Sequence, residues 1–549
     1  MKYTTLLFTA CAALLAAANS FAKPQPKPAP SVELTVLGTY SSGIFSAGGA
    51  EIVAHDPLTQ RLYVVNAQAA SVDVLDISNP ASPTKIATVN LLPFGGVANS
   101  VAVHEGLVAV AIEAVPKTAP GKVVFFDAAL TPLSSVTVGA LPDMVTFTHK
   151  GRYVLTANEG EPNTYNNFGS ETNGPSIDPE GSISIINLLG GAANLTQANV
   201  ATAGFSAYNG SEAALRAAGI RIFGPNASAS QDFEPEYIAV SADDTTAWVT
   251  LQENNAIGVI DIANATVTGL IPLGLKDHSL AGNAFDASDR DGASNGPAIN
   301  IANWPVKGMY LPDTIASFQI GTETFLVTAN EGDAREWPGF REDVRLATRN
   351  LDTNVFPNAA ALKSNARLGR LNVSSVDGDL DGDGDLDQIH SYGARSFTIR
   401  NTAGAIVFDS GDDFEVLTAA LHGTGDVIFN ASHDNNNFDA RSPSKGPEPE
   451  GVTVGRAFQH AWAFICLERI GGIMVYDVSN PSAPRFVEYA NNRNFTVAPS
   501  LANLATVGDL GPECVVFIDE GDSPTGEPLV VVGNEISGTT TIYQLKKLE

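Results

Sequence analysis

Phe325-Leu-Val-Thr-Ala-Asn-Glu-Gly-Asp333 is nearly a copy of Tyr153-Val-Leu-Thr-Ala-Asn-Glu-Gly-Glu161. Each stretch is a short apolar run, rich in β-branched residues, that ends in Asn-Glu-Gly. A proline followed by an acid precedes each copy, at Asp143 and at Asp313. The glutamate of each Asn-Glu-Gly follows that acid by 16 and 18 positions, which fits a strand, a tight turn and a returning strand. The two acids of each unit should therefore end on the same face.

The same β-unit recurs along the chain, and an internal repeat is the first feature to interpret. Three further copies pair an acid that follows a proline with a later glutamate, and two weaker copies come before all the others. The three copies join Glu236 to Glu253, Glu450 to Glu468 and Glu513 to Glu535, and the weaker ones run from Glu51 to Ala67 and from Asn99 to Glu113. The sequence thus predicts seven copies of one β-unit.

The sequence pattern predicts short strands along nearly the whole chain, each bounded by Gly, Asn, Asp or Pro. Four strands in each of seven units predict an all-β, seven-bladed β-propeller. The last unit shows only three strands, and the run from Val32 to Tyr40 is available to supply its outer strand, which would close the ring and remove exposed edges. A long array of β-sandwiches is the structural alternative. We expect one helix, around residues 211–218.

The N-terminus has the features of a secretory signal over residues 1–22: a positive charge at Lys2, an apolar core and a small-x-small site. A lipoprotein cysteine at Cys11 is the alternative. Residues 23–31 form a proline-rich linker, and residues 32–549 form a single propeller. We expect an exported protein, periplasmic or extracellular, that is monomeric and has no transmembrane anchor.

The formal net charge is −29. Such an excess of acid argues against nucleic acid or an anionic membrane surface as a partner, and it is compatible with divalent cations. Without the signal, two cysteines remain, Cys466 and Cys514. They either form a disulfide, which an oxidising compartment permits, or stay as buried apolar thiols.

Five insertions interrupt the repeats, at residues 160–180, 205–232, 273–310, 332–391 and 410–447. By strand count, each lies at a connection that opens on the same face of a propeller as the acids do. The sequence therefore predicts one elaborated, acid-lined face around the central channel and a plain opposite face.

The insertion at 332–391 holds the most specific motif, Asp377-Gly-Asp-Leu-Asp-Gly-Asp-Gly-Asp-Leu-Asp387. Calcium prefers six to eight hard oxygens, and a glycine such as Gly384 permits the sharp turn around the ion. The motif predicts calcium ligands at Asp379, Asp381, Asp383, Asp385 and Asp387; a solvated acidic loop is the alternative. Because a long loop needs something to order it, we expect a structural role for this ion. A weaker candidate comprises Asp286, Asp289 and Asp291.

Nine repeat acids should crowd the channel mouth: Asp143, Glu159, Glu236, Glu253, Asp313, Glu331, Glu450, Glu513 and Glu535. Like charges at short range repel and raise some of the pKa values. A bound divalent or transition metal would relieve this repulsion. Alternatively, each acid caps backbone N–H groups of the neighbouring blade, and the two interpretations can coexist.

Several stretches resemble the choice-of-anchor I family of secreted propellers, which is similar to the mesenchyme-specific cell surface glycoproteins. They are Leu326–Trp337, Asp286–Gly292, Ser391–Phe397, Lys445–Val452 and Glu468–Ile473. The resemblance spans nearly the whole chain after the predicted signal. It implies a secreted propeller, and because some relatives carry an alkaline phosphatase label, it also implies a phosphatase activity as one alternative.

Two classes of function follow for the acid-lined face. The first is a calcium-stabilised binding propeller for a surface or small-molecule ligand. The second is a calcium-dependent phosphoesterase, for which Arg335, Arg395, Arg469 and His433 are the candidate phosphate-binding or acid groups. For each arginine, pairing with a local acid is the alternative role. The sequence offers no nucleophile motif, and it lacks the Cys-x-x-Cys-His of a haem-binding redox propeller.

Overall fold

Short antiparallel strands make up most of the computed structural model, which describes residues 31–165, 176–423 and 427–548. Within these residues there are seven four-stranded sheets. The first four sheets follow chain order: β2 (Val53–Asp56), β3 (Arg61–Asn66), β4 (Ser71–Asp76), β5 (Thr84–Asn90); β6 (Ala98–His104), β7 (Leu107–Ile112), β8 (Pro120–Phe126), β9 (Pro132–Ala140); β10 (Pro142–Phe147), β11 (Tyr153–Asn158), β12 (Ser182–Asn187), β13 (Val200–Gly204); and β14 (Pro235–Val240), β15 (Thr246–Leu251), β16 (Ala256–Asp261), β17 (Thr266–Pro272).

The other three sheets complete the series. They are β20 (Ile315–Ile320), β21 (Glu323–Ala329), β27 (Phe397–Asn401), β28 (Ile406–Asp409); β29 (Pro449–Ala457), β30 (His460–Leu467), β31 (Ile473–Asp477), β32 (Arg485–Ala490); and β33 (Pro512–Ile518), β34 (Leu529–Asn534), β35 (Thr539–Lys547), β1 (Val32–Ser41). The first strands contact one another in the cyclic order β2, β6, β10, β14, β20, β29, β33 and again β2. This all-β arrangement is that of a β-propeller.

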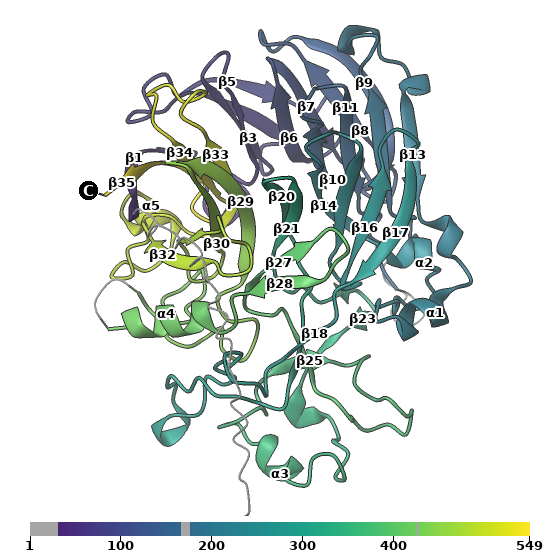
Figure 1. Cartoon of the computed structure of the whole chain (residues 1–549), viewed down its shortest axis with the longest axis vertical. Coiled ribbons are helices and arrows are strands. Elements are labelled where there is room, and N and C mark those ends of the chain that lie inside the picture. The colour runs from purple at the N-terminus through teal and green to yellow at the C-terminus, as the bar shows by residue number, and fades with distance from the viewer. Residues whose placement is uncertain (1–30, 166–175, 424–426, 549) are drawn as a thin grey trace, which may run out of the picture.

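The N-terminal strand closes the last sheet, as the sequence predicted. β1 pairs antiparallel with β35, from Val32 opposite Lys547 to Ser41 opposite Thr539, and the two strands lie side by side in Figure 1. Because β1 occupies the outer edge of this sheet, β35 has a partner on both sides.

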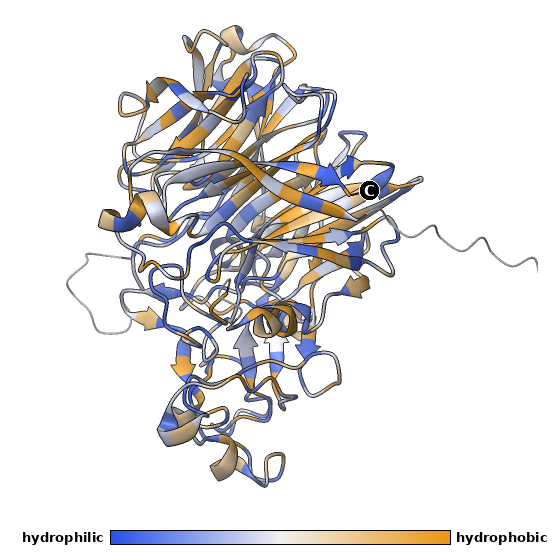
Figure 2. Ribbon diagram, turned by 90° about the vertical axis from the view of Figure 1, so that its left-hand side faces the viewer, coloured by the Kyte–Doolittle hydropathy of each residue, from blue (hydrophilic) through white to orange (hydrophobic). Residues whose placement is uncertain are grey.

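The hydrophobic core lies between neighbouring sheets. Leu155 and Ile183 of the third sheet pack in one cluster with Val249 and Ile260 of the fourth. A strand with a sheet on each face is apolar throughout, and Figure 2 shows such apolar segments along the stacked strands. This packing explains why the second strand of each unit reads as an uninterrupted apolar run.

Two insertions that are far apart in the sequence form one additional sheet, which the sequence did not reveal. Its strands are β18 (Leu275–Asp277), β19 (Lys307–Met309), β26 (His390–Tyr392), β25 (Asn372–Ser374) and β24 (Asp343–Arg345), with β19 and β26 parallel. A separate apolar cluster that includes Val306, Leu346 and Val373 lies in the same region, seen at the bottom of Figure 1 with α3 (Ala359–Leu362). The insertion at 332–391 is thus ordered in part by a sheet and an apolar cluster that it shares with the insertion at 273–310; an ordering role for calcium stays a prediction.

The remaining elements are short. The predicted helix is α1 (Glu212–Ala217). The other α-helices and strands are α2 (Ala229–Asp232), α4 (Asp413–Leu421), α5 (Leu504–Val507) and the hairpin of β22 (Glu336–Trp337) and β23 (Phe340–Arg341), and short 3-10 helices lie in the loops. In the described part of the chain, no helix has the length and apolarity needed to cross a bilayer. The predicted signal, Cys11 and nearly all of the predicted linker lie outside the described residues, as do parts of the insertions at 160–180 and 410–447.

Cys466 and Cys514 are both buried free thiols. Of the two alternatives that the sequence left open, the structure therefore has the apolar thiols. Burial raises the pKa of the Cys514 thiol to about 11.

Candidate metal centre at the channel mouth

In four of the units, a β-bulge places the first acid in the channel. In the third sheet, Pro142 pairs with Asn158 and Met144 with Ala157, so Asp143 between them has no partner on β11. The same shift follows Pro235, Pro449 and Pro512. A β-bulge changes the direction in which the side chain of the extra residue points. The acids at these bulges line cavities in the channel.

The second acid of a unit follows a strand end that an asparagine fixes. Asn330 Nδ2 donates to Thr398 Oγ1 at 2.8 Å, which ties the end of β21 to β27. Glu331 comes next, and Gly332 then adopts a φ of +90°, where a Cβ would collide with the backbone of Gly393. Glycine permits this left-handed turn, so Asn-Glu-Gly ends the strand and leaves the glutamate at the mouth.

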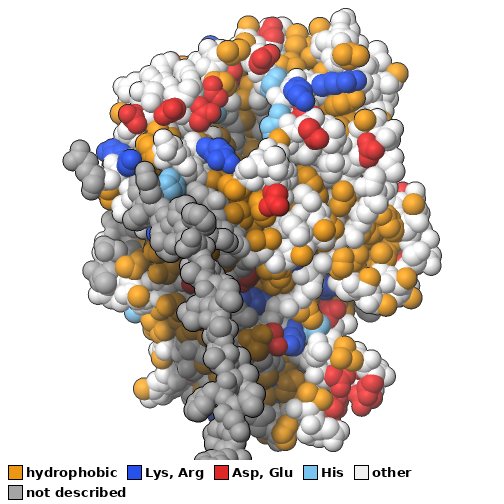
Figure 3. Space-filling model, in the orientation of Figure 1, with side chains coloured by type: hydrophobic (Ala, Val, Ile, Leu, Met, Phe, Trp, Pro, Cys, Tyr) orange, Lys and Arg blue, Asp and Glu red, His pale blue; other side chains and the backbone are white. Residues whose placement is uncertain are grey.

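The acids converge on a cavity of about 380 Å³, which we call the mouth. Its lining holds eleven acids against Lys445, Arg469 and His433: Glu159, Glu161, Glu236, Glu253, Asp313, Glu331, Asp333, Glu450, Glu468, Glu513 and Glu535. Eight of the nine predicted channel acids are among them, and the ninth, Asp143, lines a smaller cavity together with Asp313 and Glu513. By contrast, acidic side chains on the face shown in Figure 3 lie in small separate groups.

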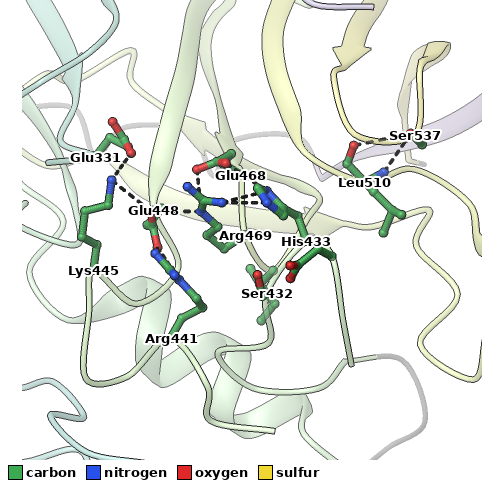
Figure 4. A network of polar contacts seen from close by, with 12 residues as sticks. Glu331, Ser432, His433, Arg441, Lys445, Glu448, Glu468, Arg469, Leu510 and Ser537 are labelled. Carbon is green, nitrogen blue, oxygen red and sulfur yellow. Dashed lines mark hydrogen bonds and ion pairs between the residues drawn. The ribbon is translucent and has the colours of Figure 1, made fainter. Parts of the chain in front are cut away.

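The basic residues of the mouth are held on one side by Glu448, which the sequence analysis did not single out. Lys445 Nζ lies 3.1 Å from Glu448 and also pairs with Glu331. Arg469 Nε lies 3.1 Å from Glu448 and 2.9 Å from Glu468, and Arg441 Nε donates to Glu448 at 2.8 Å (Figure 4). Burial alone would raise the pKa of Glu448, but Arg441, Lys445 and Arg469 outweigh burial and hold it well below its usual range.

His433 contributes a nitrogen donor beside this network. Its Nδ1 lies 3.0 Å from Glu468 Oε1, and Arg469 Nη1 lies 2.7 Å from its Nε2 (Figure 4). His433, Glu468 and Glu535 each offer one atom within 4.8 Å of the others, and Glu331, Glu448 and Glu468 form a second such group. Imidazole with carboxylates suits zinc or another transition metal, whereas carboxylates alone suit calcium or magnesium.

Elsewhere in the lining, Lys117 pairs with Glu161, while five other acids of the mouth have no ion pair within the described ranges. Burial, followed by neighbouring acids, raises the pKa of Glu159, Glu236, Asp313, Glu450 and Glu513 well above the usual range. Burial likewise raises the pKa of Asp143, Glu253 and Glu535 to about 7. One carboxylate oxygen each of Glu253 and Glu450 is buried without a hydrogen-bond partner among the described residues. Buried polar atoms are nearly always satisfied, so these oxygens call for a cation or a proton.

Two of the predicted arginines serve the structure and do not line the mouth. Arg335 pairs with Asp232 at 2.6 Å and Glu234 at 3.0 Å. Arg395 pairs with Glu415 and donates to the Ser442 carbonyl at 2.8 Å. Pairing with local acids, the alternative left open by the sequence, therefore describes both side chains.

The aspartate loop brings three of its five predicted ligands together. Asp379, Asp381 and Asp387 offer oxygens within 4.8 Å of one another, and Asp383 and Asp385 do not belong to this group. Gly384, at a φ of +98°, donates its N–H to Asp379 at 3.0 Å, so the predicted glycine turn is present.

In the weaker candidate, Asp286, Asp289 and Asp291 do not form such a group among the described residues. Asp289 pairs with Arg370 at 2.8 Å.

Comparison with known proteins gives the family. The choice-of-anchor I domain model matches residues 51–481. Gigasin-3a of Magallana gigas is 28% identical over 198 residues, which cover 34% of this chain and 68% of that protein. Kuenenia stuttgartiensis hydrazine synthase aligns with 91% of this chain and 97% of its own at 12% identity and a TM-score of 0.44. The Cps50 (Swd1) β-propeller domain of Myceliophteria thermophila aligns with 94% and 100% at 7% identity and a TM-score of 0.43. On the extent of the match to the family model, the chain belongs to the choice-of-anchor I family.

Proposed function

We propose that this protein is an extracytoplasmic, seven-bladed β-propeller that binds calcium at the aspartate loop and a divalent cation at the mouth, through which it holds a small-molecule or surface ligand. The predicted signal and the family support the location. The seven four-stranded sheets, with first strands in cyclic contact, support the blade count.

The observation that carries the mouth proposal is its charge balance. The lining holds eleven acids, two side chains that are always cationic and one histidine, and Lys117, outside the lining, pairs with Glu161. Carboxylates this close cannot all ionise without a counter-ion, and one oxygen each of Glu253 and Glu450 has no hydrogen-bond partner among the described residues. A divalent cation provides the missing charge, and a cavity of about 380 Å³ falls within the range of small-molecule sites.

The second part of the proposal, calcium at the aspartate loop, rests on the grouping of Asp379, Asp381 and Asp387. Three carboxylates supply part of a calcium shell, which backbone carbonyls and water can complete. The two sites differ in donor type, because only the mouth offers an imidazole.

We do not extend the proposal to hydrolysis of phosphate esters. Arg335 and Arg395 are held in buried ion pairs. The described lining of the mouth contains no serine, threonine or cysteine.

The test is metal analysis of the purified protein, followed by equilibrium dialysis against calcium and zinc. Glu468→Gln and His433→Ala should each lower cation binding at the mouth and leave the aspartate loop loaded. Glu323→Gln, at an exposed position on β21, is the matched control and should bind as the wild type does. Equal binding by all these variants would refute the mouth site.

A further inference from the structure

A second large cavity lies where three insertions meet, and it shares no lining residue with the mouth. Its volume is about 560 Å³, and most of its wall comes from the insertions at 205–232, 273–310 and 332–391. We call it the insertion pocket. Its apolar side chains are Ile220, Ile222, Phe223, Leu275, Met309, Val376 and Leu380. Its volume falls within the range of small-molecule sites.

Apolar side chains that are open to solvent gather around this pocket. Leu275, Val376 and Leu380 are 40%, 42% and 66% exposed. Single exposed apolar residues are common on protein surfaces, whereas a group of them in one place marks a site of interaction. Ile220 and Met309, which also line the pocket, are buried. The pocket therefore offers an apolar surface on which a ligand can bury its own apolar part.

One ion pair joins two walls of the pocket. Arg221 donates to Asp377 from Nε at 3.0 Å and from Nη2 at 2.8 Å. Its Nη1 donates to the Glu253 carbonyl at 2.6 Å, and its guanidinium lies 4.2 Å from the centre of the Phe223 ring. Because Arg221 and Asp377 belong to different insertions, their pairing fixes the two walls relative to each other. The charges of this pair compensate one another and are not available to a ligand.

Arg216 is the basic residue of the lining whose charge is available. It forms no ion pair with any described residue, and its Nη1 donates to the Ile222 carbonyl at 3.0 Å, which holds the guanidinium at the wall. The third basic residue, His390, is neutral at physiological pH because burial lowers its pKa. A guanidinium has further N–H donors and binds carboxylate, sulfonate or phosphate groups in a forked geometry. Arg216 therefore favours an anionic group on the ligand.

The aspartate loop forms another wall of the pocket, through Asp379 and Leu380. Leu380 stands between Asp379 and Asp381, and its N–H donates to Asp387 at 2.8 Å. These three acids are the ones that the structure groups as candidate calcium ligands. Calcium on them would fix the position of Leu380 and neutralise Asp379, which otherwise repels an anion. The loop thus connects the calcium site to the pocket.

We infer that the insertion pocket binds one small organic anion with an apolar body, of the aromatic carboxylate or sulfonate class, and that calcium at the aspartate loop strengthens this binding. The pocket is separate from the mouth, and only its calcium dependence rests on the proposed function. The apolar wall takes the body of the ligand, and Arg216 takes its acidic group. Since coupling between two sites is reciprocal, the ligand should strengthen calcium binding by the same factor.

The test uses two fluorescent probes that share an aromatic body, anilinonaphthalene sulfonate and the uncharged phenylnaphthylamine. Titration of the full-length protein in calcium should show one sulfonate bound per chain. Arg216→Gln should weaken sulfonate binding about tenfold, as expected for loss of a charge-assisted hydrogen bond, and should leave the uncharged probe unaffected. Leu275→Ser should weaken the binding of both probes, because the probes share the apolar contact.

Matched controls exist for both substitutions. Arg290 and Leu189 are 49% and 76% exposed and lie outside the lining of the pocket. Arg290→Gln and Leu189→Ser should bind both probes as the wild type does. The side chains of Arg216 and Leu275 are themselves exposed, so their variants should fold.

Calcium dependence is measured with the same probe. A chelator should weaken binding of the sulfonate by the wild type. Asp381 is outside the lining of the pocket, so Asp381→Asn in calcium should bind the sulfonate as weakly as the wild type does in chelator. His433→Ala, which alters the mouth alone, should keep the affinity of the wild type.

The inference falls if Arg216→Gln and Leu275→Ser bind both probes as the wild type does. If Leu275→Ser weakens both probes while Arg216→Gln binds the sulfonate unchanged, the anionic class of ligand is refuted. Equal sulfonate affinity in calcium and in chelator refutes the calcium dependence. If calcium titration shows that the aspartate loop binds no ion, the proposed calcium site fails, and Arg216→Gln and Leu275→Ser still decide whether the pocket binds organic anions.

Discussion

Substitution of Arg335 tests most directly whether the arginines predicted to bind phosphate have a structural role instead. Its side chain is 1% exposed, and it contacts Asp232 and Glu234, which are 0% and 2% exposed. Its guanidinium also donates to the Asp232 carbonyl at 2.6 Å and lies 4.5 Å from the centre of the Phe223 ring. Burial opposes the charge, but the two acids more than offset it and raise the pKa of Arg335 well above its usual range. The residue thereby ties the insertion at 332–391 to the insertion at 205–232.

The substitution Arg335→Met leaves two buried carboxylates without a counter-charge. Removing one partner of a buried pair costs about 3–5 kcal/mol. Roughly 500 folded residues at about 2 cal/mol/K each give an unfolding entropy of about 1 kcal/mol/K, so the melting temperature should fall by about 3–5 °C. Differential scanning calorimetry at neutral pH measures this shift.

The matched control is Arg341→Met, in the hairpin that follows. Arg341 is 65% exposed and pairs with Glu336 and Asp343. Asp343 is 7% exposed, but the guanidinium itself is in contact with solvent, and ion pairs of exposed side chains contribute about 0–1 kcal/mol, so this variant should melt closer to the wild type than Arg335→Met does. Equal melting temperatures for the two variants would refute the structural role of Arg335.

Three other predictions concern the cations and ring closure. With a metal chelator present, the free energy of unfolding should fall as the pH rises from about 5 to about 8. Folding raises the pKa of Glu51 to about 8 and that of Glu535 to about 7, so the folded state binds more protons than the unfolded state in this pH range. Calcium should reduce that slope, and thermal melts across the pH range with and without calcium measure both effects. Asp381→Asn should remove one calcium per chain in calorimetric titration while the mouth variants still bind at the aspartate loop, and unchanged stoichiometry would contradict that site. Deletion of residues 31–41 should expose the edge of β35 and produce oligomers in light scattering, whereas a monomeric product would show that β1 is dispensable for closure.

Local sequence was enough to predict most of the propeller. Strand periodicity and turn residues depend on neighbours along the chain, so the repeats, α1 and the pairing of β1 with β35 could be read directly. The convergence of the acids followed in the same way, because each acid occupies an equivalent place in its unit. Whether these acids bind metal stays a prediction.

Several partners of the charged side chains could not be predicted, because they come from segments distant in the sequence. Glu448 stands in Gly446-Pro-Glu-Pro-Glu450, and that repeated Pro-Glu was an available signal. Two of its basic partners, Arg441 and Lys445, stand seven and three positions before it, whereas Arg469 reaches it only because the insertion at 410–447 folds against the end of β30. Likewise, nothing near Arg335 in the chain indicates Asp232.

The sequence by itself determined a series of similar β-units with an acid at most equivalent strand starts and strand ends, because strand alternation and glycine turns are set by residues a few positions apart. Tertiary structure alone decided that two insertions share a sheet, with Lys307 beside His390, and that Lys445 and Lys117 pair with the mouth acids Glu331 and Glu161. Both depend on contacts between distant segments, whose free energy comes from burial and charge pairing that no local pattern encodes.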